Sequence, residues 1–303
     1  MEIMYEFVER MPEVSAVYGY GSGVFKQTNN NPNKKTNLDM MIVIPNKYKN
    51  PKEWHNKNMK LNKGDYSLIG GLTFKYGNEN KIDGITGISY ISDIEYKGVL
   101  FKYGTISESN FEKHILKWDS FYVPGRLQKP TLSLVSNRKF DYLIAKNRYN
   151  ALMTATFLQA GDSATKEEIL TTLCSLSYKG DTRMAIGEKP TKVTDIVTGS
   201  FNEFEKIYNF DDMEYLIPCG DKYIIDRPKL LDTMYSLPDS LLQHIEFALN
   251  TGDEEIIKRS IYNYLNNINR LESIAQMKKG IATDGFVKSS VYAYRKVQKR
   301  FSA

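Results

Sequence analysis

The chain has 303 residues, enough for one large domain or two ordinary ones, each with its own core. No run approaches the ~20 apolar residues that a membrane-spanning helix needs, and Cys174 and Cys219 give neither a zinc spacing nor a disulfide framework. The formal charge of +5 equals that of the last eighteen residues, so a neutral body carries a basic end, unlike a general nucleic-acid binder.

The residues up to about 130 are rich in runs dense in Ile, Val, Tyr, Thr and Phe, which predict strands. These runs are Val14–Tyr20, Leu38–Ile44, Ser67–Tyr76, Ile85–Ile94 and Val99–Ile106, with a hairpin turn at Ile94–Gly98 between the last two. Helices are predicted over Glu2–Arg10, Pro51–Met59 and Ser109–Trp118. This pattern predicts a mixed sheet domain with helices.

From about residue 140 the apolar residues follow helical spacing instead. We expect helices over Tyr142–Leu158, Thr165–Ser177, Pro238–Leu249 and Glu254–Arg270. The second begins with a cap signature, because Thr165 is followed three residues later by Glu168. A mainly helical second module is therefore predicted.

The most informative stretch is Tyr18-Gly-Tyr-Gly-Ser-Gly-Val-Phe-Lys26, which is followed after an Asn-rich loop by Leu38-Asp-Met-Met-Ile-Val-Ile44. Glycines let backbone N–H groups approach a triphosphate closely. A carboxylate on the adjacent strand can hold the magnesium ion that bridges the phosphates. We therefore expect a nucleotidyltransferase, in which Gly21, Ser22 and Gly23 hold phosphate oxygens and Asp39 binds Mg²⁺.

Each of these features also has a structural interpretation. Gly-Ser-Gly occurs in ordinary tight turns, and Asp39 can be a charge at a strand edge. Many nucleotidyltransferases carry two carboxylates spaced by one residue, so that both leave the same strand face. Here the second position is Met41, and a further metal ligand must come from elsewhere; Asp83 and Asp93 are candidates by position only.

Several further short motifs follow one another along the chain. They are Trp54-His-Asn-Lys-Asn58, Asp65-Tyr-Ser67, Leu100-Phe-Lys-Tyr-Gly104, Trp118, Phe121-Tyr-Val-Pro-Gly-Arg-Leu-Gln-Lys-Pro130, Leu176-Ser-Tyr-Lys-Gly-Asp-Thr-Arg-Met184 and Lys278-Lys-Gly-Ile-Ala282. With the two opening segments, they closely resemble the peripheral phosphatidate cytidylyltransferases of the translocator assembly and maintenance family. The resemblance runs from about residue 17 to residue 295.

The resemblance implies an α+β architecture in three parts. A nucleotidyltransferase domain would span residues 1–135, a helical, winged-helix-like domain 136–285, and a basic amphipathic membrane-binding tail 286–303. It also implies a reaction, in which phosphatidic acid and CTP, with Mg²⁺, give CDP-diacylglycerol and pyrophosphate. A single Asp in the Leu-Asp segment is the family's own pattern, so Met41 is no departure from it.

Phosphoryl chemistry of this kind needs charge screening more than a base, because the acceptor phosphate is already anionic. Lys102 lies in a strand of apolar and aromatic residues and is a candidate for stabilising the reacting phosphorus, or it lies on a solvated face. Arg126 and Lys129 are candidates for binding the phosphate of phosphatidic acid, with a basic surface loop as the alternative.

Other candidates concern the nucleotide. Arg183 and Lys192 are expected at the triphosphate, although Asp181 and Arg183 can equally form a structural ion pair after a helix that ends at Gly180. Tyr103 is a candidate for stacking on cytosine, or it is a core residue. His55 is expected to serve packing or hydrogen bonding rather than metal binding, because no other histidine stands at ligand spacing.

On a helix, the tail places apolar and basic residues on separate stripes, which is typical of helices that lie in the headgroup plane. The residues expected to bind the membrane are Lys288, Val291, Tyr294, Arg295, Lys299 and Phe301. Each basic residue near an anionic surface contributes about 1 kcal/mol, which supports reversible attachment. A frayed, solubilising terminus or a packed terminal helix is the alternative.

The start of the chain carries early acids and no presequence pattern. We therefore expect a bacterial relative at the cytoplasmic face of the cell membrane, with the matrix face of the mitochondrial inner membrane as the alternative. The expected partners are CTP, phosphatidic acid and an anionic membrane, with no nucleic acid. Rival functions are a nucleotidyltransferase acting on a soluble or RNA acceptor and an inactive assembly factor with the same fold.

Overall fold

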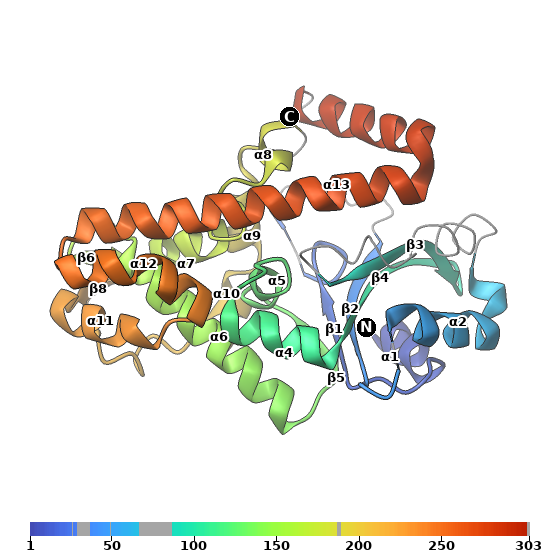
Figure 1. Ribbon diagram of the computed structural model, residues 1–303, viewed down its shortest axis with the longest axis horizontal. Coiled ribbons are helices and arrows are strands. Elements are labelled where there is room, and N and C mark those ends of the chain that lie inside the picture. Colours follow the sequence, from blue (N-terminus) through green and yellow to red (C-terminus); the bar gives the residue numbers. More distant parts are fainter. Residues whose placement is uncertain (26, 29–36, 49, 67–86, 187–188, 302–303) are drawn as a thin grey trace. The chain divides into compact units, whose positions relative to one another are not determined.

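The computed structural model describes the backbone of residues 1–25, 27–28, 37–48, 50–66, 87–186 and 189–301, and the side chains of these residues except 93, 185–186 and 279–301. The chain divides into two compact units (Figure 1). The first unit consists of Met1–Glu112, Thr131–Asp141 and Ile274–Ala303. The second unit consists of Lys113–Pro130 and Tyr142–Ser273.

A mixed five-stranded sheet forms the centre of the first unit, in the order β3-β4-β2-β1-β5. Its strands are β1 (Ala16–Tyr20), β2 (Leu38–Ile44), β3 (Ser89–Tyr96), β4 (Val99–Ser107) and β5 (Leu132–Val135). The β2–β4 pair is parallel and the other pairs are antiparallel. The strands are rich in β-branched and aromatic residues, which fit a pleated and buried surface.

One face of this sheet packs on two helices, α1 (Glu2–Glu9) and α2 (Pro51–Leu61), and α2 leads into the short turn η1 (Lys63–Asp65). Because strand side chains alternate, Met40, Ile42 and Ile44 of β2 all face this core and are fully buried. The Asn50 side chain caps α2 by accepting a hydrogen bond from the Glu53 backbone N–H. The odd-numbered residues of β2 therefore point to the opposite face.

Two further helices, α4 (Glu108–Lys117) and α6 (Arg138–Phe157), begin in the first unit and continue in the second. In the first unit, Phe111 of α4 stacks on Tyr18 of β1 and contacts Phe140 of α6 edge-on. These rings cover part of the sheet face that carries the odd-numbered residues of β2.

The second unit is mainly helical and contains a small antiparallel sheet in the order β6-β8-β7. Its strands are β6 (Ser163–Thr165), β7 (Leu216–Cys219) and β8 (Lys222–Ile225). Its remaining helices are α5 (Pro124–Leu127), α7 (Lys166–Ser175), α8 (Thr182–Ile186), α9 (Lys192–Gly199), α10 (Phe201–Ile207), α11 (Arg227–Thr233), η2 (Met234–Ser236), α12 (Asp239–Thr251) and the start of α13 (Glu254–Phe301). The first strand, β6, is followed by helices and then pairs with the later hairpin β7–β8. This order of elements is that of a winged helix.

Several sequence predictions are confirmed. The mixed sheet and the helices are present, β2 has the predicted bounds, and Thr165 and Glu168 form the predicted capping box of α7. The predicted helix Glu254–Arg270 is too short, because α13 continues to Phe301. The short strands β5, β6, β7 and β8 were not predicted, and the predicted strand Ser67–Tyr76 lies outside the described residues. The domain limits at 135 and 285 stay a prediction.

Gly180 provides a test of how tightly the second unit is packed. Its φ is +75°, and an added Cβ would overlap the backbone O of Asn266 on α13 and lie 2.7 Å from its Cα. Gly252 has a similar φ of +68° but open space around it. We expect Gly252→Ala to cost about 1–2 kcal/mol from backbone strain alone and Gly180→Ala to cost about 1–3 kcal/mol more. Denaturant unfolding of both variants measures the difference, and equal losses would refute the close contact.

Candidate active site

The predicted metal ligand, Asp39, is the second residue of β2 and lies between two other strands. Its Cα partners are Tyr20 on β1 and Lys102 on β4. Residues that face each other across neighbouring strands present their side chains on the same side of the sheet. The register therefore brings Asp39 and Lys102, two residues that the sequence selected separately, together with Tyr20 on the face opposite to the α1–α2 core.

The loop after β1 folds back against Asp39. Gly21 has a φ of +79°, and an added Cβ there would lie 3.2 Å from Asp39 Oδ2. The Gly21 carbonyl accepts hydrogen bonds from the backbone N–H groups of Val24 (3.1 Å) and Phe25 (2.9 Å), which closes a single turn. Ser22 lies in this turn, and a Cβ on Gly23 would overlap the Asn37 carbonyl. The predicted Gly-Ser-Gly segment and Asp39 therefore form one constellation.

The position that would carry a second carboxylate is closed to solvent. Met41 shares the strand face of Asp39 and is fully buried. A carboxylate at this position would therefore be buried in the core. Asp83 lies outside the described residues, as does the side chain of Asp93. In the part of the chain that the structure describes, no group of three His, Cys, Asp or Glu side chains gathers at one point.

The site nevertheless fits a magnesium ion that arrives with a nucleotide. Mg²⁺ is commonly held by one or two carboxylates together with substrate phosphates and waters. Asp39 is partly exposed near the start of β2, and the glycine beside it, Gly21, has no Cβ. The carboxylate is therefore accessible to a metal ion from the side of this turn.

Two tyrosines that the sequence did not single out complete this face. The Lys102 ammonium lies 5.1 Å from the centroid of the Tyr90 ring, and the hydroxyls of Tyr20 and Tyr90 are 3.3 Å apart. Gly104 makes room for Tyr90, because a Cβ there would lie 2.7 Å from the ring. Tyr20 was detectable, since it ends the glycine-flanked strand, whereas the position of Tyr90 depends on strand pairing.

The structure does not bring Tyr103 to this face. Tyr103 follows Lys102 in β4 and points the opposite way, where it is fully buried and its hydroxyl contacts His55 Nδ1 (2.8 Å) and Asn58 Nδ2 (3.1 Å). Its predicted stacking on the nucleotide is therefore replaced by a core role. Burial lowers the pKa of His55 to about 3, in agreement with the expected packing and hydrogen-bonding function.

A second concentration of charge lies within the second unit and is centred on Lys129. Burial, together with the positive charges of Arg126, Lys192 and Arg183, lowers the pKa of Lys129 to about 8. Its ammonium donates to the Gly125 carbonyl (2.5 Å) and to Ser177 Oγ (2.6 Å). We call Arg126, Lys129, Arg183 and Lys192 the cation cluster.

The members of the cation cluster come from separate segments. Arg126 of α5 donates to the Tyr122 carbonyl (2.6 Å), and its guanidinium lies 3.5 Å from the centroid of the Tyr122 ring. Arg183 of α8 forms a two-pronged pair with Asp181, with the predicted ion-pair geometry. The sequence analysis assigned two of these residues to phosphatidic acid and two to the triphosphate of CTP. In the structure all four contribute to one cluster.

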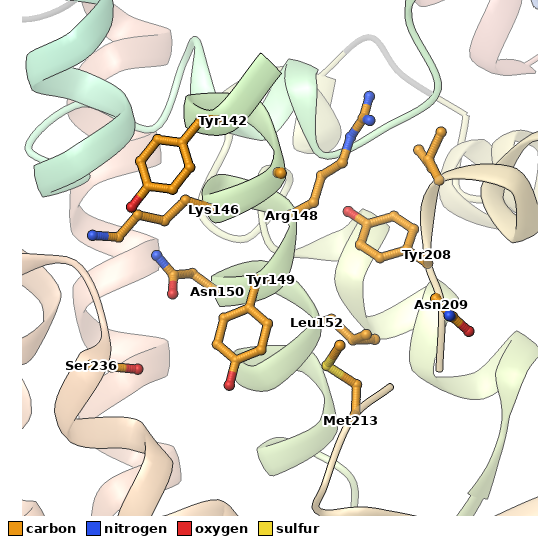
Figure 2. A pocket seen from close by; sticks show the side chains of 12 residues that line it. Tyr142, Lys146, Arg148, Tyr149, Asn150, Leu152, Tyr208, Asn209, Met213 and Ser236 are labelled. Atoms are coloured by element: carbon orange, nitrogen blue, oxygen red, sulfur yellow. The ribbon is translucent and has the colours of Figure 1, made fainter. Parts of the chain in front are cut away.

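A separate groove of about 560 Å³ lies along α6 in the second unit (Figure 2). Figure 2 shows Tyr142, Lys146 and Tyr149 of α6 on one side and Tyr208 and Met213 on the other. None of the residues predicted from the sequence lines this groove. The predicted charged residues lie instead around Asp39 in the first unit and, separately, in the cation cluster of the second unit.

The tail predicted to bind membranes is helical in its backbone up to Phe301, as part of α13. The side chains of its predicted contacts, Lys288, Val291, Tyr294, Arg295, Lys299 and Phe301, lie outside the described residues. Across the described part of the chain, each helix is too short or too polar to span a bilayer.

Comparison with known proteins gives independent evidence on the family of this chain. Residues 4–216 match the model of a family described as "Phosphatidate cytidylyltransferase, mitochondrial". Proteins of that name from Bos taurus and Rattus norvegicus are 29% and 30% identical to this chain, each over 95% of this chain and 90% of the relative. The protein of that name from Caenorhabditis elegans is 27% identical over 94% of both chains.

The lowered pKa of Lys129 makes stability depend on pH. Between pH 8 and 10 the unfolded lysine keeps its proton while the folded one loses it, so the unfolded state binds more protons and stability rises with pH. We expect this rise to be smaller in Lys129→Met, as measured by denaturant unfolding at pH 7.5 and 9.5. The difference between the two proteins isolates Lys129, because other groups titrate in both. Parallel profiles would show that Lys129 titrates normally.

Proposed function

Because this chain belongs to the phosphatidate cytidylyltransferase family, we propose that it transfers the cytidylyl group of CTP to phosphatidic acid, forming CDP-diacylglycerol and pyrophosphate. The observation that carries this proposal is the strand register that sets Asp39 beside Lys102 and against Gly21, in a chain of this family. A reaction of this kind belongs to phospholipid biosynthesis.

The reaction proceeds by displacement at phosphorus. A phosphate oxygen of phosphatidic acid attacks the α-phosphorus of CTP, and the bond from that phosphorus to the bridging oxygen of the β-phosphate breaks. Pyrophosphate leaves with the electron pair of that bond. The attacking oxygen is already anionic near neutral pH, so no protein base has to remove a proton, and the obstacle is repulsion between two anions.

The residues on the Asp39 face suit this task. Bound Mg²⁺ would neutralise charge on the phosphates, and Asp39 is the residue that would hold it. The Lys102 ammonium, on the next strand, is placed to offset negative charge that develops at the α-phosphorus. The Gly21–Gly23 turn offers backbone N–H groups and the Ser22 hydroxyl to phosphate oxygens.

The cation cluster suits the phosphate of the acceptor. Phosphatidic acid is a phosphomonoester, whose charge is larger than that of the diesters in most lipids. Arg126 presents a planar fork that matches phosphate oxygens, and Lys129 supplies a compact charge. Arg183 is held in place by its ion pair with Asp181.

The presence of these groups bears on the rival functions. An inactive assembly factor has no need for Asp39, Lys102 and Gly21 to converge, and their convergence favours catalysis. We infer that the protein acts at a membrane surface, since its acceptor is a lipid and basic charge is concentrated in residues 286–303. The relatives carry the word mitochondrial in their names, which is the alternative location considered above. The cell-membrane location stays a prediction.

Asp39→Asn tests the catalytic face, since it keeps the shape of the side chain and removes the charge. With labelled CTP, Mg²⁺ and phosphatidic acid vesicles, we expect formation of CDP-diacylglycerol to fall by about 100-fold or more. Glu95→Gln, an exposed carboxylate on β3 of the same sheet, serves as the control and should be fully active. Full activity of Asp39→Asn would remove Asp39 from the site, and an inactive wild type under all metal conditions would refute the proposed function.

The tail is tested by replacing Lys288, Arg295 and Lys299 together with Gln. Loss of three charges near an anionic surface should weaken binding by about 3 kcal/mol, or about 100-fold. Sedimentation with phosphatidylglycerol vesicles at moderate salt measures this change, and neutral phosphatidylcholine vesicles provide the reference. Unchanged sedimentation, both for this variant and after deletion of residues 286–303, would contradict membrane attachment by the tail.

A further inference from the structure

Three buried polar side chains on α13, Asn269, Glu272 and Ser273, hold loops of the second unit. Their exposed fractions are 5%, 2% and 3%. Burying polar groups is unfavourable unless they find hydrogen-bond partners, and each of these three finds its partners in a loop that carries members of the cation cluster. We call the three residues the α13 clamp.

Glu272 holds the segment that carries Arg126 and Lys129. Its Oε1 accepts a hydrogen bond from the Phe121 backbone N–H at 2.8 Å. The next residue, Tyr122, supports Arg126 twice, because its carbonyl accepts from the guanidinium at 2.6 Å and its ring lies beneath it at 3.5 Å. Glu272 therefore fixes the residue on which Arg126 rests.

Asn269 and Ser273 hold the segment that leads to Arg183. Asn269 Nδ2 donates to the carbonyls of Leu176 (2.8 Å) and Lys179 (2.9 Å), which follow the end of α7. Ser273 Oγ accepts from the backbone N–H of Thr182 (3.2 Å) and from its hydroxyl (2.9 Å). Arg183 comes next in the chain, so its backbone is fixed from α13.

The two held segments also meet at Lys129, whose ammonium donates to Ser177 Oγ. Ser177 follows Leu176, one of the residues bound by Asn269. Four cations repel one another when brought together, and this repulsion adds to burial in lowering the pKa of Lys129. Some part of the fold must hold them in place, and the contacts above run to a single stretch of one helix.

We propose that Asn269, Glu272 and Ser273 are positioning residues that set the two loops of the cation cluster for a phosphomonoester group, the phosphate of the lipid acceptor. The residues touch no substrate themselves. The proposal rests on the proposed function for the identity of the ligand. The proposal gives α13 a role in acceptor binding that the sequence pattern of this helix did not predict.

The test uses Asn269→Ala, Glu272→Ala and Ser273→Ala in the full chain, with initial rates measured against phosphatidic acid and against CTP. Loss of a hydrogen bond that fixes a binding loop should raise the KM for phosphatidic acid by about ten-fold. The KM for CTP and kcat should change by less than about two-fold, since the α13 clamp does not act on the transition state. Asn267→Ala and Glu255→Gln, both exposed on the same helix, are the matched controls and should behave as wild type.

Ser273→Thr keeps the hydroxyl and should therefore have a KM for phosphatidic acid close to that of wild type, unlike Ser273→Ala. A purely structural role for the site would not require this recovery. If Asn269→Ala or Glu272→Ala fails to fold, as judged by circular dichroism, Ser273→Ala decides the question, because it removes only one oxygen atom. An unchanged KM for phosphatidic acid in folded Ser273→Ala, or equal changes for both substrates, would overturn the proposal.

A wild type that makes no CDP-diacylglycerol would refute the proposed function but leave the α13 clamp testable. Calorimetric titration with inorganic phosphate then replaces the rate assay. The affinity for phosphate should fall by about ten-fold in the same variants and stay constant in the controls. Equal affinity in wild type and Ser273→Ala would overturn the positioning role independently of the reaction.

Discussion

The pairing of β2 with β1 on one side and β4 on the other is the constraint on which the face that carries Asp39 and Lys102 depends. It sets Tyr20, Asp39 and Lys102 in one row. The register is held from the other side of the sheet, where Met40, Ile42 and Ile44 are buried against α1 and α2. A slip by one residue would turn Asp39 into the core and expose Met40. The buried residues of β2 thus determine where its only charged side chain, Asp39, appears.

The same alternation explains which predicted site residues lie on one face of the sheet. Asp39 and Lys102 could be found from the sequence because each interrupts an apolar strand with a charge. Tyr103 could not be assigned in this way, since its face depends on the register of β4 with its neighbours. Tyr90 was out of reach, because the pairing of β3 with β4 shifts register between Ile91 and Ile94. A local pattern cannot reveal such a shift, which arises from packing between strands.

The cation cluster shows a second limit of sequence reasoning. The residue types were predictable, because Arg126, Lys129, Arg183 and Lys192 stand in loops or at helix starts beside glycines and prolines. Their common location was not, because tertiary packing brings together segments up to about 66 residues apart in a chain that has no repeated pattern. Holding like charges together in a partly buried place lowers stability, and such arrangements concentrate at functional sites. An anion that satisfies them would recover that loss.

We propose different tasks for the two concentrations of positive charge in this chain, the tail of residues 286–303 and the cation cluster. Charges that attract a membrane act through water and are screened within about 8–10 Å at physiological salt. The cluster around Lys129 is partly buried, where screening is weaker and where Asp181 and the Tyr122 ring fix the geometry of the cations. Charges of the first kind would draw a protein to any anionic surface, whereas charges of the second kind would discriminate among phosphates by shape. The positions that Asn269, Glu272 and Ser273 give to the cation cluster are therefore the proposed basis for recognising a phosphomonoester.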